Sequence, residues 1–237
     1  MKFDLHFISE EKLTEICADI VQKGQSAVVN SDEKLFDNIV DPFSALFDSA
    51  ISGITLSEWI KREKTRQMQK TLQNAIGTFH QNVIGSIDGW EDLGTGNIID
   101  LRCQSKKILA EVKNKWNTTK GNHKVRVYDD IKKLLEQPKN KGFKGYYVAI
   151  LSKAKINAPF TPSDNETSSR RPIDENIVEV DGATFYDIAT GEKDSLKKLY
   201  QTLPYILSNI LNNKDIEKYL REPIFNILSE KSLDLMN

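Results

Sequence analysis

Residues 145–151, with the sequence Gly-Tyr-Tyr-Val-Ala-Ile-Leu, form the most apolar segment of the chain. Near-continuous apolar runs of this length are typical of strands that are buried on both faces, in the middle of a sheet. We therefore expect this segment to be the central strand of a β-sheet. The 237 residues are enough for one large domain or two small ones built around such a sheet.

The segments on either side of this strand predict helices and further strands. In chain order we expect helical segments before residue 52, a long helix at 55–85 opened by a Thr55/Glu58 capping box, a strand hairpin at 98–102 and 108–113, a basic helix at 123–137, a second hairpin at 177–186 and a helical tail from 194. This order predicts an α/β fold, a mixed β-sheet flanked by helices with an N-terminal helical part. We expect an N-terminal helical region, 1–64, and a core with C-terminal helices, 65–237, packed as one compact unit.

Residues 153–175 connect the central strand to the second predicted hairpin. They contain three prolines, many Ser, Thr, Asn and Asp residues, and the pair Arg170-Arg171. A connection of this length is unusual unless it has a function, so we interpret it as a functional loop.

The formal net charge of −1 conceals an uneven distribution of charge. Residues 102–144 contain 13 basic and 4 acidic residues, a local balance of +9, whereas the rest of the chain has a balance of −10. One basic block on a slightly acidic chain is typical of a protein that meets a polyanion on one face. The alternative is a solvated, charged helix face, which is the usual explanation for a run of charges.

Other features narrow the class of protein. The sequence has no run of about 18 apolar residues, which argues against a membrane protein, and its first residues lack an apolar stretch of signal-peptide length. Cys17 and Cys103 are the only cysteines, too few for a disulfide framework or a Cys-rich zinc site. We therefore expect a soluble protein of the cytoplasm.

Three charged side chains in the first hairpin form the pattern that points to chemistry. Glu111 and Lys113 lie two residues apart on one strand, so they project from the same face, and Asp100 on the preceding strand lies across from them. Two converging carboxylates form a hard oxygen site that suits Mg²⁺, and a lysine beside them can hold a water or stabilise charge on a phosphate. This arrangement predicts phosphodiester hydrolysis by a metal-activated water.

The triplet of an acidic residue, any residue and lysine is not specific on its own. It occurs four times in the chain, starting at Glu10, Asp32, Glu111 and Asp130. Only the triplet at Glu111 follows an apolar strand and an aspartate on a neighbouring strand. The alternative interpretation is an ordinary ion pair on an exposed hairpin edge.

The residues around this pattern resemble a known family. Segments 96–100 (Gly-Asn-Ile-Ile-Asp) and 110–115 (Ala-Glu-Val-Lys-Asn-Lys) resemble the core of the PD-(D/E)XK nucleases. The wider stretch 89–118, together with Asp181-Gly182, Phe185-Tyr186 and Thr190-Gly191, resembles type II restriction endonucleases that cut GGNCC. The resemblance covers residues 65–210, and it departs from the usual pattern at Ile99, where such nucleases often have proline.

This resemblance implies a restriction-endonuclease-like sheet and assigns roles to the hairpin residues. Asp100 and Glu111 are then the ligands of a Mg²⁺ ion, with the main-chain carbonyl of Val112 as a further ligand. Lys113 positions the attacking water.

Many such nucleases also use a polar residue from the helix that precedes the hairpin. His80 and Gln81 are the catalytic candidates at that position, and a structural role for His80 is an equal alternative. We expect Glu91 and Asp92 to belong to the connecting loop.

Recognition of a GC-rich site requires contacts to guanine in the major groove, for which arginine and lysine are best suited. We expect Arg170 and Arg171 in the long loop to make these contacts. Further DNA-binding candidates lie beside the metal site and on the basic helix: Lys115, Asn117, Thr118, Lys124 and Arg126. The basic helix is expected to contact phosphates, which sets the register on DNA without reading its sequence.

The interpretation that we favour is Mg²⁺-dependent cleavage of double-stranded DNA at a short palindromic site. A palindrome implies a reader with two-fold symmetry, so we expect a homodimer, with a companion DNA methyltransferase encoded nearby. Two alternatives stay open at this point. One is a structure-specific repair or junction nuclease of the same fold, and the other is a non-catalytic DNA-binding module that uses the basic block.

Overall fold

A computed structural model describes residues 3–29, 35–37, 39–94, 96–117, 121–164 and 167–233. The chain divides into two compact units: one combines Met1–Ile16 with Thr78–Asn237, and the other is Cys17–Gly77. Helix α1 (Glu10–Val29) begins in the first unit and continues into the second. The first unit contains the sheet and all the residues of the predicted metal site.

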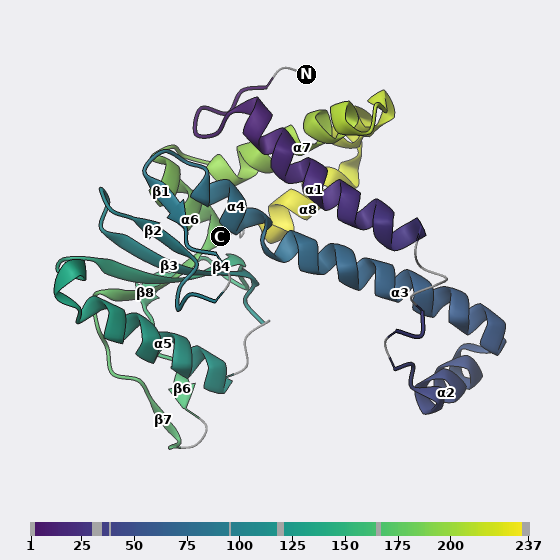
Figure 1. The fold of residues 1–237 in the computed structure, drawn as a ribbon, viewed down its shortest axis with the longest axis horizontal. Helices are drawn as coiled ribbons and strands as arrows, with labels where there is room; N and C mark the ends of the chain where they lie inside the picture. The colour runs from purple at the N-terminus through teal and green to yellow at the C-terminus, as the bar shows by residue number, and fades with distance from the viewer. Residues whose placement is uncertain are drawn as a thin grey trace. The chain divides into compact units, whose positions relative to one another are not determined.

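A six-stranded mixed sheet lies at the centre of the first unit, in the order β1-β2-β3-β4-β8-β5 (Figure 1). Its strands are β1 (Trp90–Asp92), β2 (Leu101–Cys103), β3 (Ile108–Lys115), β4 (Lys144–Leu151), β5 (Asn157–Pro159) and β8 (Ile177–Asp181). The first three strands pair antiparallel, β3, β4 and β8 pair parallel, and β5 is an antiparallel edge. The apolar run forms β4, between β3 and β8, so the predicted central strand and the mixed sheet flanked by helices are confirmed.

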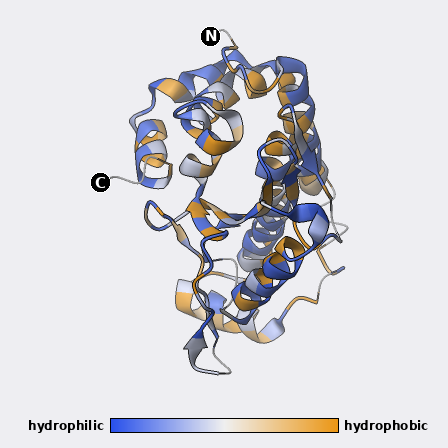
Figure 2. Cartoon of the chain, turned by 90° about the vertical axis from the view of Figure 1, so that its left-hand side faces the viewer, coloured by the Kyte–Doolittle hydropathy of each residue, from blue (hydrophilic) through white to orange (hydrophobic). Residues whose placement is uncertain are grey.

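Helices cover both faces of this sheet (Figure 1). Helix α5 (Gly121–Leu135) connects β3 to β4 and packs on one face, while α4 (Phe79–Gly85) and α6 (Gly182–Thr190) pack on the other. The remaining elements of this unit are η1 (Pro138–Asn140), the ribbon of β6 (Ser163–Asp164) and β7 (Ser169–Arg170), α7 (Ser195–Ile210), η2 (Lys214–Arg221) and α8 (Pro223–Ser232). Orange and blue stretches alternate along the helices in Figure 2, as expected of helices with one buried side.

The strand register sorts the site residues onto one face of the sheet. Glu111, Tyr147 and Glu179 are register partners across β3, β4 and β8, so they form one row. Tyr147 belongs to a core cluster with Tyr128 and Ile131 of α5, which places this row on the α5 face. The next row lies on the opposite face and is entirely apolar: Val112, Val148 and Val180.

The second unit is helical and consists of the rest of α1, α2 (Pro42–Ser52) and α3 (Leu56–Gly77). The predicted capping box is present, since the Thr55 N–H donates to Glu58 Oε2 at 2.8 Å and the Glu58 N–H donates to Thr55 Oγ1 at 3.2 Å. Helix α2 is tied to α3 by a hydrogen bond of 2.9 Å from Trp59 Nε1 to Asp48 Oδ2. No helix among the described residues is long and apolar enough to cross a membrane.

The predicted hairpin at 177–186 is wrong. Strand β8 is present, but helix α6 begins at Gly182, immediately after it. The Asp181 carboxylate caps this helix by accepting hydrogen bonds from the Thr184 N–H (2.8 Å) and the Thr184 hydroxyl (2.9 Å). Asp-Gly is typical of a tight hairpin turn, but here the aspartate satisfies the free N–H groups at a helix start.

Two other predicted elements are shorter in the structure. The helix predicted at 55–85 is interrupted, because α3 ends at Gly77 and α4 begins at Phe79. The strand predicted at 98–102 begins only at Leu101, since Gly94 and Gly96 turn the chain with φ angles of 73° and 97°. In contrast, the loop predicted at 153–175 contains three short strands, β5, β6 and β7.

The α5 face depends on a close approach between α5 and β4. A Cβ atom at Gly145 would lie 2.1 Å from Cγ2 of Ile131, a fully buried branched side chain. We expect Gly145→Ala to lower the free energy of unfolding by about 1–3 kcal/mol, because a packed core resists an added methyl group. Urea denaturation measures this loss, and Gly77→Ala is the control because nothing lies within 4 Å of a Cβ at Gly77. Equal stability of the two variants would contradict the prediction.

Candidate active site

Asp100, Glu111 and Lys113 converge where the pairing of β2 with β3 ends. The last contact of the two strands is a hydrogen bond of 3.1 Å from the Asp100 N–H to the Ala110 carbonyl. Beyond it, Oδ2 of Asp100 accepts a hydrogen bond of 2.7 Å from the Val112 N–H. Lys113 Nζ lies 2.5 Å from Glu111 Oε1 and 3.9 Å from Asp100 Oδ2. The structure therefore brings together the three side chains that the sequence pattern selects.

The two carboxyl groups are largely buried and share a hydrogen bond. The pKa of Glu111 is raised to about 7, first by burial and then by the negative charge of Asp100, while the Lys113 ammonium opposes this rise. Burial also raises the pKa of Asp100, against the lowering effect of the Val112 N–H. Two acidic groups held together away from water favour a state in which one of them keeps a proton.

The donor set at this position fits a divalent metal ion. Two carboxylates with raised pKa values would be stabilised as anions by a cation between them, and hard oxygen ligands suit Mg²⁺. The N–H and C=O groups of one strand residue point to the same edge, so the Val112 carbonyl faces the side on which Asp100 lies. Among the described residues no group of three or more His, Cys, Asp or Glu side chains is arranged to hold a metal. Mg²⁺ in protein sites commonly binds one or two carboxylates and keeps waters and substrate phosphate oxygens as its other ligands, which suits this donor set.

Asp92 is a further acidic residue of the site that sequence reasoning missed. It was expected in a connecting loop, but it lies in β1, paired with Leu101 of β2. Oδ1 of Asp92 accepts hydrogen bonds of 2.8 Å from Gln81 Nε2 and from the Gly94 N–H. Burial is the largest cause of the raised pKa of Asp100, and the negative charge of Asp92 is a smaller one. The two carboxylates therefore lie close enough to interact. A strand of three residues has too little alternation to be recognised in the sequence.

The two catalytic candidates from the helix before the hairpin occupy different positions. Gln81 reaches the site through Asp92, with which it forms the hydrogen bond described above. His80 Nδ1 forms a hydrogen bond of 2.9 Å with the Tyr186 hydroxyl, and its ring packs edge-on against Phe79 and Tyr186. Burial lowers the pKa of His80 to about 4, which keeps the imidazole neutral at physiological pH. These contacts are those of a packing residue, which is the alternative to a catalytic role for His80.

Helix α4 holds Asp92 in place by a second close approach. A Cβ atom at Gly85, the last residue of α4, would lie 2.7 Å from Cβ of Asp92. Only glycine lets the helix end so close to β1 without displacing the strand. The Gln81 side chain from the same helix then reaches the Asp92 carboxylate.

The basic candidates near the site differ in exposure. Lys115, the last residue of β3, and Asn117, just beyond the strand, are both exposed. Thr118 lies outside the described residues. On α5, Arg126 is exposed, whereas Lys124 turns toward the sheet. Lys124 Nζ lies 5.1 Å from the centre of the Tyr147 ring and 3.4 Å from Glu179 Oε1. Lys124 therefore adds positive charge to the row of residues that contains Glu111.

The two candidate arginines of the long loop have different contacts. Arg171 donates to both Asp129 carboxylate oxygens at 2.8 Å and to Asp164 Oδ2 at 3.1 Å. This bidentate ion pair fastens the β6–β7 ribbon to α5. Arg170 is exposed and makes a single hydrogen bond of 3.3 Å to the Thr161 carbonyl within the described residues.

Comparison with known proteins connects this geometry to a family. The family model of the Eco47II restriction endonuclease matches residues 5–212, which include the entire hairpin. The chain belongs to the Eco47II restriction endonuclease family. This match extends the resemblance seen at residues 65–210 to the N-terminal helices.

Two relatives support membership of the Eco47II family. The chain is 37% identical over 215 residues to the type II restriction enzyme Eco47II of Escherichia coli, with 89% of each chain covered. It is 32% identical over 228 residues to the type II restriction enzyme Sau96I of Staphylococcus aureus, with 90% of this chain and 84% of that enzyme covered. The prediction of a type II restriction endonuclease, an enzyme that hydrolyses DNA at specific sites, is confirmed.

The raised pKa of Glu111 makes stability depend on pH when no metal is bound. The group keeps its proton up to about pH 7 in the folded chain but loses it near pH 4.5 in the unfolded chain, so its effect on folding becomes unfavourable as pH rises between these values. We expect metal-free Glu111→Gln to match the wild type at pH 4.5 and to exceed it at pH 8 by on the order of 2 kcal/mol. Urea denaturation with EDTA across this range measures the difference. A difference that does not change with pH would contradict the prediction.

Proposed function

We propose that this member of the Eco47II family hydrolyses both strands of DNA in a Mg²⁺-dependent reaction at a short palindromic site of the GGNCC type. The observation that carries the proposal is the convergence of Asp100, Glu111 and Lys113 beside the main chain of Val112. The other parts of the proposal are a homodimer, a cytoplasmic location and a companion methyltransferase that protects the host DNA. They follow from restriction at a palindrome.

In this proposal Asp100, Glu111 and the Val112 carbonyl are the residues that hold the metal. A bound Mg²⁺ ion supplies polarisation of the phosphodiester and activation of a water. The two carboxylates would hold the cation in ionised form, so loading of the site would release the proton that they share to the solvent. The Val112 N–H keeps Asp100 oriented through its hydrogen bond to Oδ2.

Lys113 has two tasks in this proposal. Its ammonium lies 2.5 Å from Glu111 Oε1, and both residues belong to β3. The strand therefore keeps Lys113 at the site with or without a bound cation. From there it orients the attacking water and offsets the negative charge that develops on the phosphate. Gln81 of α4 supports the site by holding the Asp92 carboxylate of β1 near Asp100.

The exposed basic and polar residues around the site are the proposed DNA contacts. Lys115 and Asn117 extend from the metal site, and Arg126 on α5 contacts phosphates. Arg170 is the proposed guanine reader, because its guanidinium is exposed and its hydrogen bond to the Thr161 carbonyl is long, at 3.3 Å. Arg171 holds the ribbon that presents Arg170, through Asp129 and Asp164.

The metal site is tested by Glu111→Ala on supercoiled plasmid with MgCl₂. We expect the cleavage rate to fall by about 10³-fold or more, because a site without this carboxylate loses several kcal/mol of transition-state stabilisation. Glu230→Ala, which removes an exposed carboxylate on α8, is the control and should cut like the wild type. Undiminished cutting by Glu111→Ala would overturn the assignment. Sequencing the ends of the wild-type fragments tests the palindrome, and branched DNA as the only substrate would refute it.

The two arginines are separated by measuring both cleavage and stability. We expect Arg170→Ala to slow cleavage of the cognate site by roughly 10- to 100-fold with an unchanged Tm, because a guanine contact is worth about 1–3 kcal/mol of discrimination. Arg171→Ala should lower the Tm, because the bidentate ion pair with Asp129 and the hydrogen bond to Asp164 are lost. Single-turnover cleavage and thermal unfolding measure these effects. A lower Tm for Arg170→Ala together with an unchanged Tm for Arg171→Ala would reverse the assignment.

A further inference from the structure

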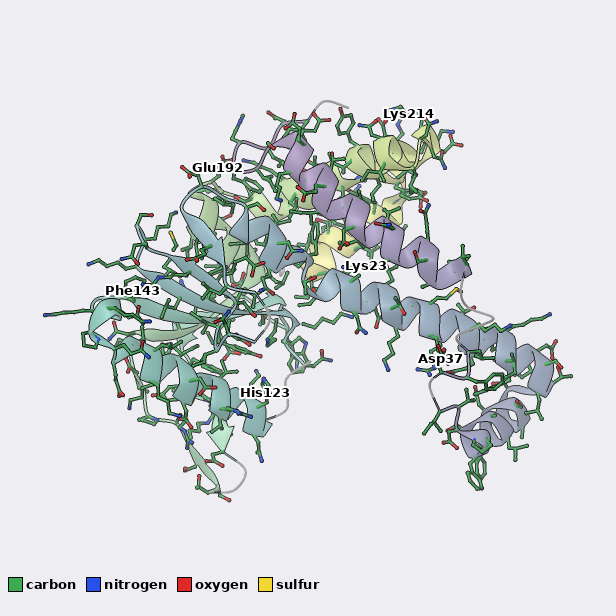
Figure 3. The ribbon with its side chains drawn as sticks, in the orientation of Figure 1. Lys23, Asp37, His123, Phe143, Glu192 and Lys214 are labelled. Carbon is green, nitrogen blue, oxygen red and sulfur yellow. The ribbon has the colours of Figure 1, made fainter. Side chains whose placement is uncertain are left out.

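Helix α2 of the second unit exposes its apolar side. Phe43, Leu46, Phe47 and Ile51 recur at the spacing of one helical stripe, and their exposed fractions are 71%, 58%, 70% and 84%. The residues that α2 buries are small ones, Ala45 and Ser49. We call the four large residues the α2 apolar face; Figure 3 shows side chains that project from α2 away from α3.

The helix that carries this face is well defined by its own ends. The Asp41 side chain caps its start by accepting a hydrogen bond of 2.9 Å from the Phe43 N–H, and Pro42 occupies the first turn. Gly53 closes its end in the left-handed conformation, with φ of 63°. The Asp48–Trp59 hydrogen bond fixes its rotation relative to α3. The exposed stripe is therefore a consequence of the local fold.

The charges around the α2 apolar face argue against DNA as its partner. Residues 35–58 contain four acidic side chains, Asp37, Asp41, Asp48 and Glu58, and no lysine or arginine. A polyanion would be repelled from this segment, whereas DNA-binding surfaces need basic side chains. The fitting partner is an apolar protein surface.

The exposed apolar area matches what one subunit of a dimer contributes. Phe36 and Ile39, which precede α2 in the chain, are also exposed, at 72% and 100%. Together with the α2 apolar face they expose about 800 Å², roughly the area that each partner buries in a standard protein interface. In a two-fold dimer the same face meets itself, so an apolar stripe needs no complementary charge from a different protein.

We propose that the α2 apolar face is the dimerisation surface of this enzyme and that its occupant is the α2 apolar face of a second copy. The proposal rests on the proposed function in one respect, since a two-fold palindrome calls for a two-fold reader. A second exposed apolar group lies on α8, where Ile224 and Leu228 are 52% and 51% exposed. The α2 apolar face has the more exposed side chains, and the α8 group provides a matched comparison.

The test is the molar mass of the full-length chain in solution, measured by light scattering after size exclusion. The wild type is expected at twice the chain mass of 27.0 kDa. Phe43→Asp/Phe47→Asp should elute as a monomer at the same concentration, with unchanged circular dichroism because both positions are exposed, and with a lower Tm because the stabilisation from dimerisation is lost. The milder Phe47→Ala should weaken the dimer Kd by at least about tenfold. The matched control, Ile224→Asp/Leu228→Asp, should stay dimeric.

Two results would overturn the proposal: a monomeric wild type, and a dimer that tolerates Phe43→Asp/Phe47→Asp, whether or not that variant loses DNA affinity. Glu111→Ala keeps this test apart from that of the proposed function, because it removes a site carboxylate and leaves α2 intact. It should dimerise as the wild type does. A chain that dimerises through α2 but cuts no DNA refutes the function alone, whereas a cutting dimer held by another face refutes this proposal alone.

Discussion

The arrangement of the site depends on one interaction, the hydrogen bond from the Val112 N–H to Asp100. Strand β2 pairs with β3 only as far as Ala110, and from Glu111 onward none of the described strands pairs with that edge of β3. The Asp100 carboxylate takes the place of the missing strand carbonyl at 2.7 Å. The same hydrogen bond holds the Asp100 carboxylate close to the Glu111 and Lys113 side chains. A strand that pairs on one side and is open on the other thus provides both a rigid support and an accessible edge.

The rest of the sheet keeps this edge rigid and keeps the acidic pair away from water. Strand β4 pairs with β3 in parallel and β8 pairs with β4, and the apolar row of Val112 is buried on the far face. On the near face, α5 approaches β4 as closely as Gly145 permits and directs Lys124 to the row of Glu111. The burial that results raises the pKa values of both carboxyl groups. A cation in the site would restore the balance of charge, and a substrate phosphate would bring further negative charge to the lysines.

The sequence predicted the parts of the fold and site that depend on local geometry. The central strand follows from an apolar run, and the convergence of Asp100 with Glu111 and Lys113 follows from hairpin pairing and the two-residue period of a strand. Predictions were wrong where one sequence signal serves two structures. Asp181-Gly182 suited a turn but caps α6, and the helix at 55–85 is interrupted at Thr78. A strand as short as β1, with three residues, has too little alternation for the sequence to place Asp92 on a strand.

The sequence by itself selected the three charged residues that converge, their support on a hairpin and the basic block of residues 102–144, because these features arise from neighbours along the chain. The tertiary structure decided what distant segments do to those residues. It placed Asp92 beside Asp100 through the Gly85 approach, turned His80 toward Tyr186, and paired Arg171 with Asp129 while Arg170 stayed exposed. It also left the apolar stripe of α2 exposed, although the same stripe in the sequence is typical of a core helix. Periodicity shows that a helix has an apolar side, but only packing decides whether that side is buried within the chain.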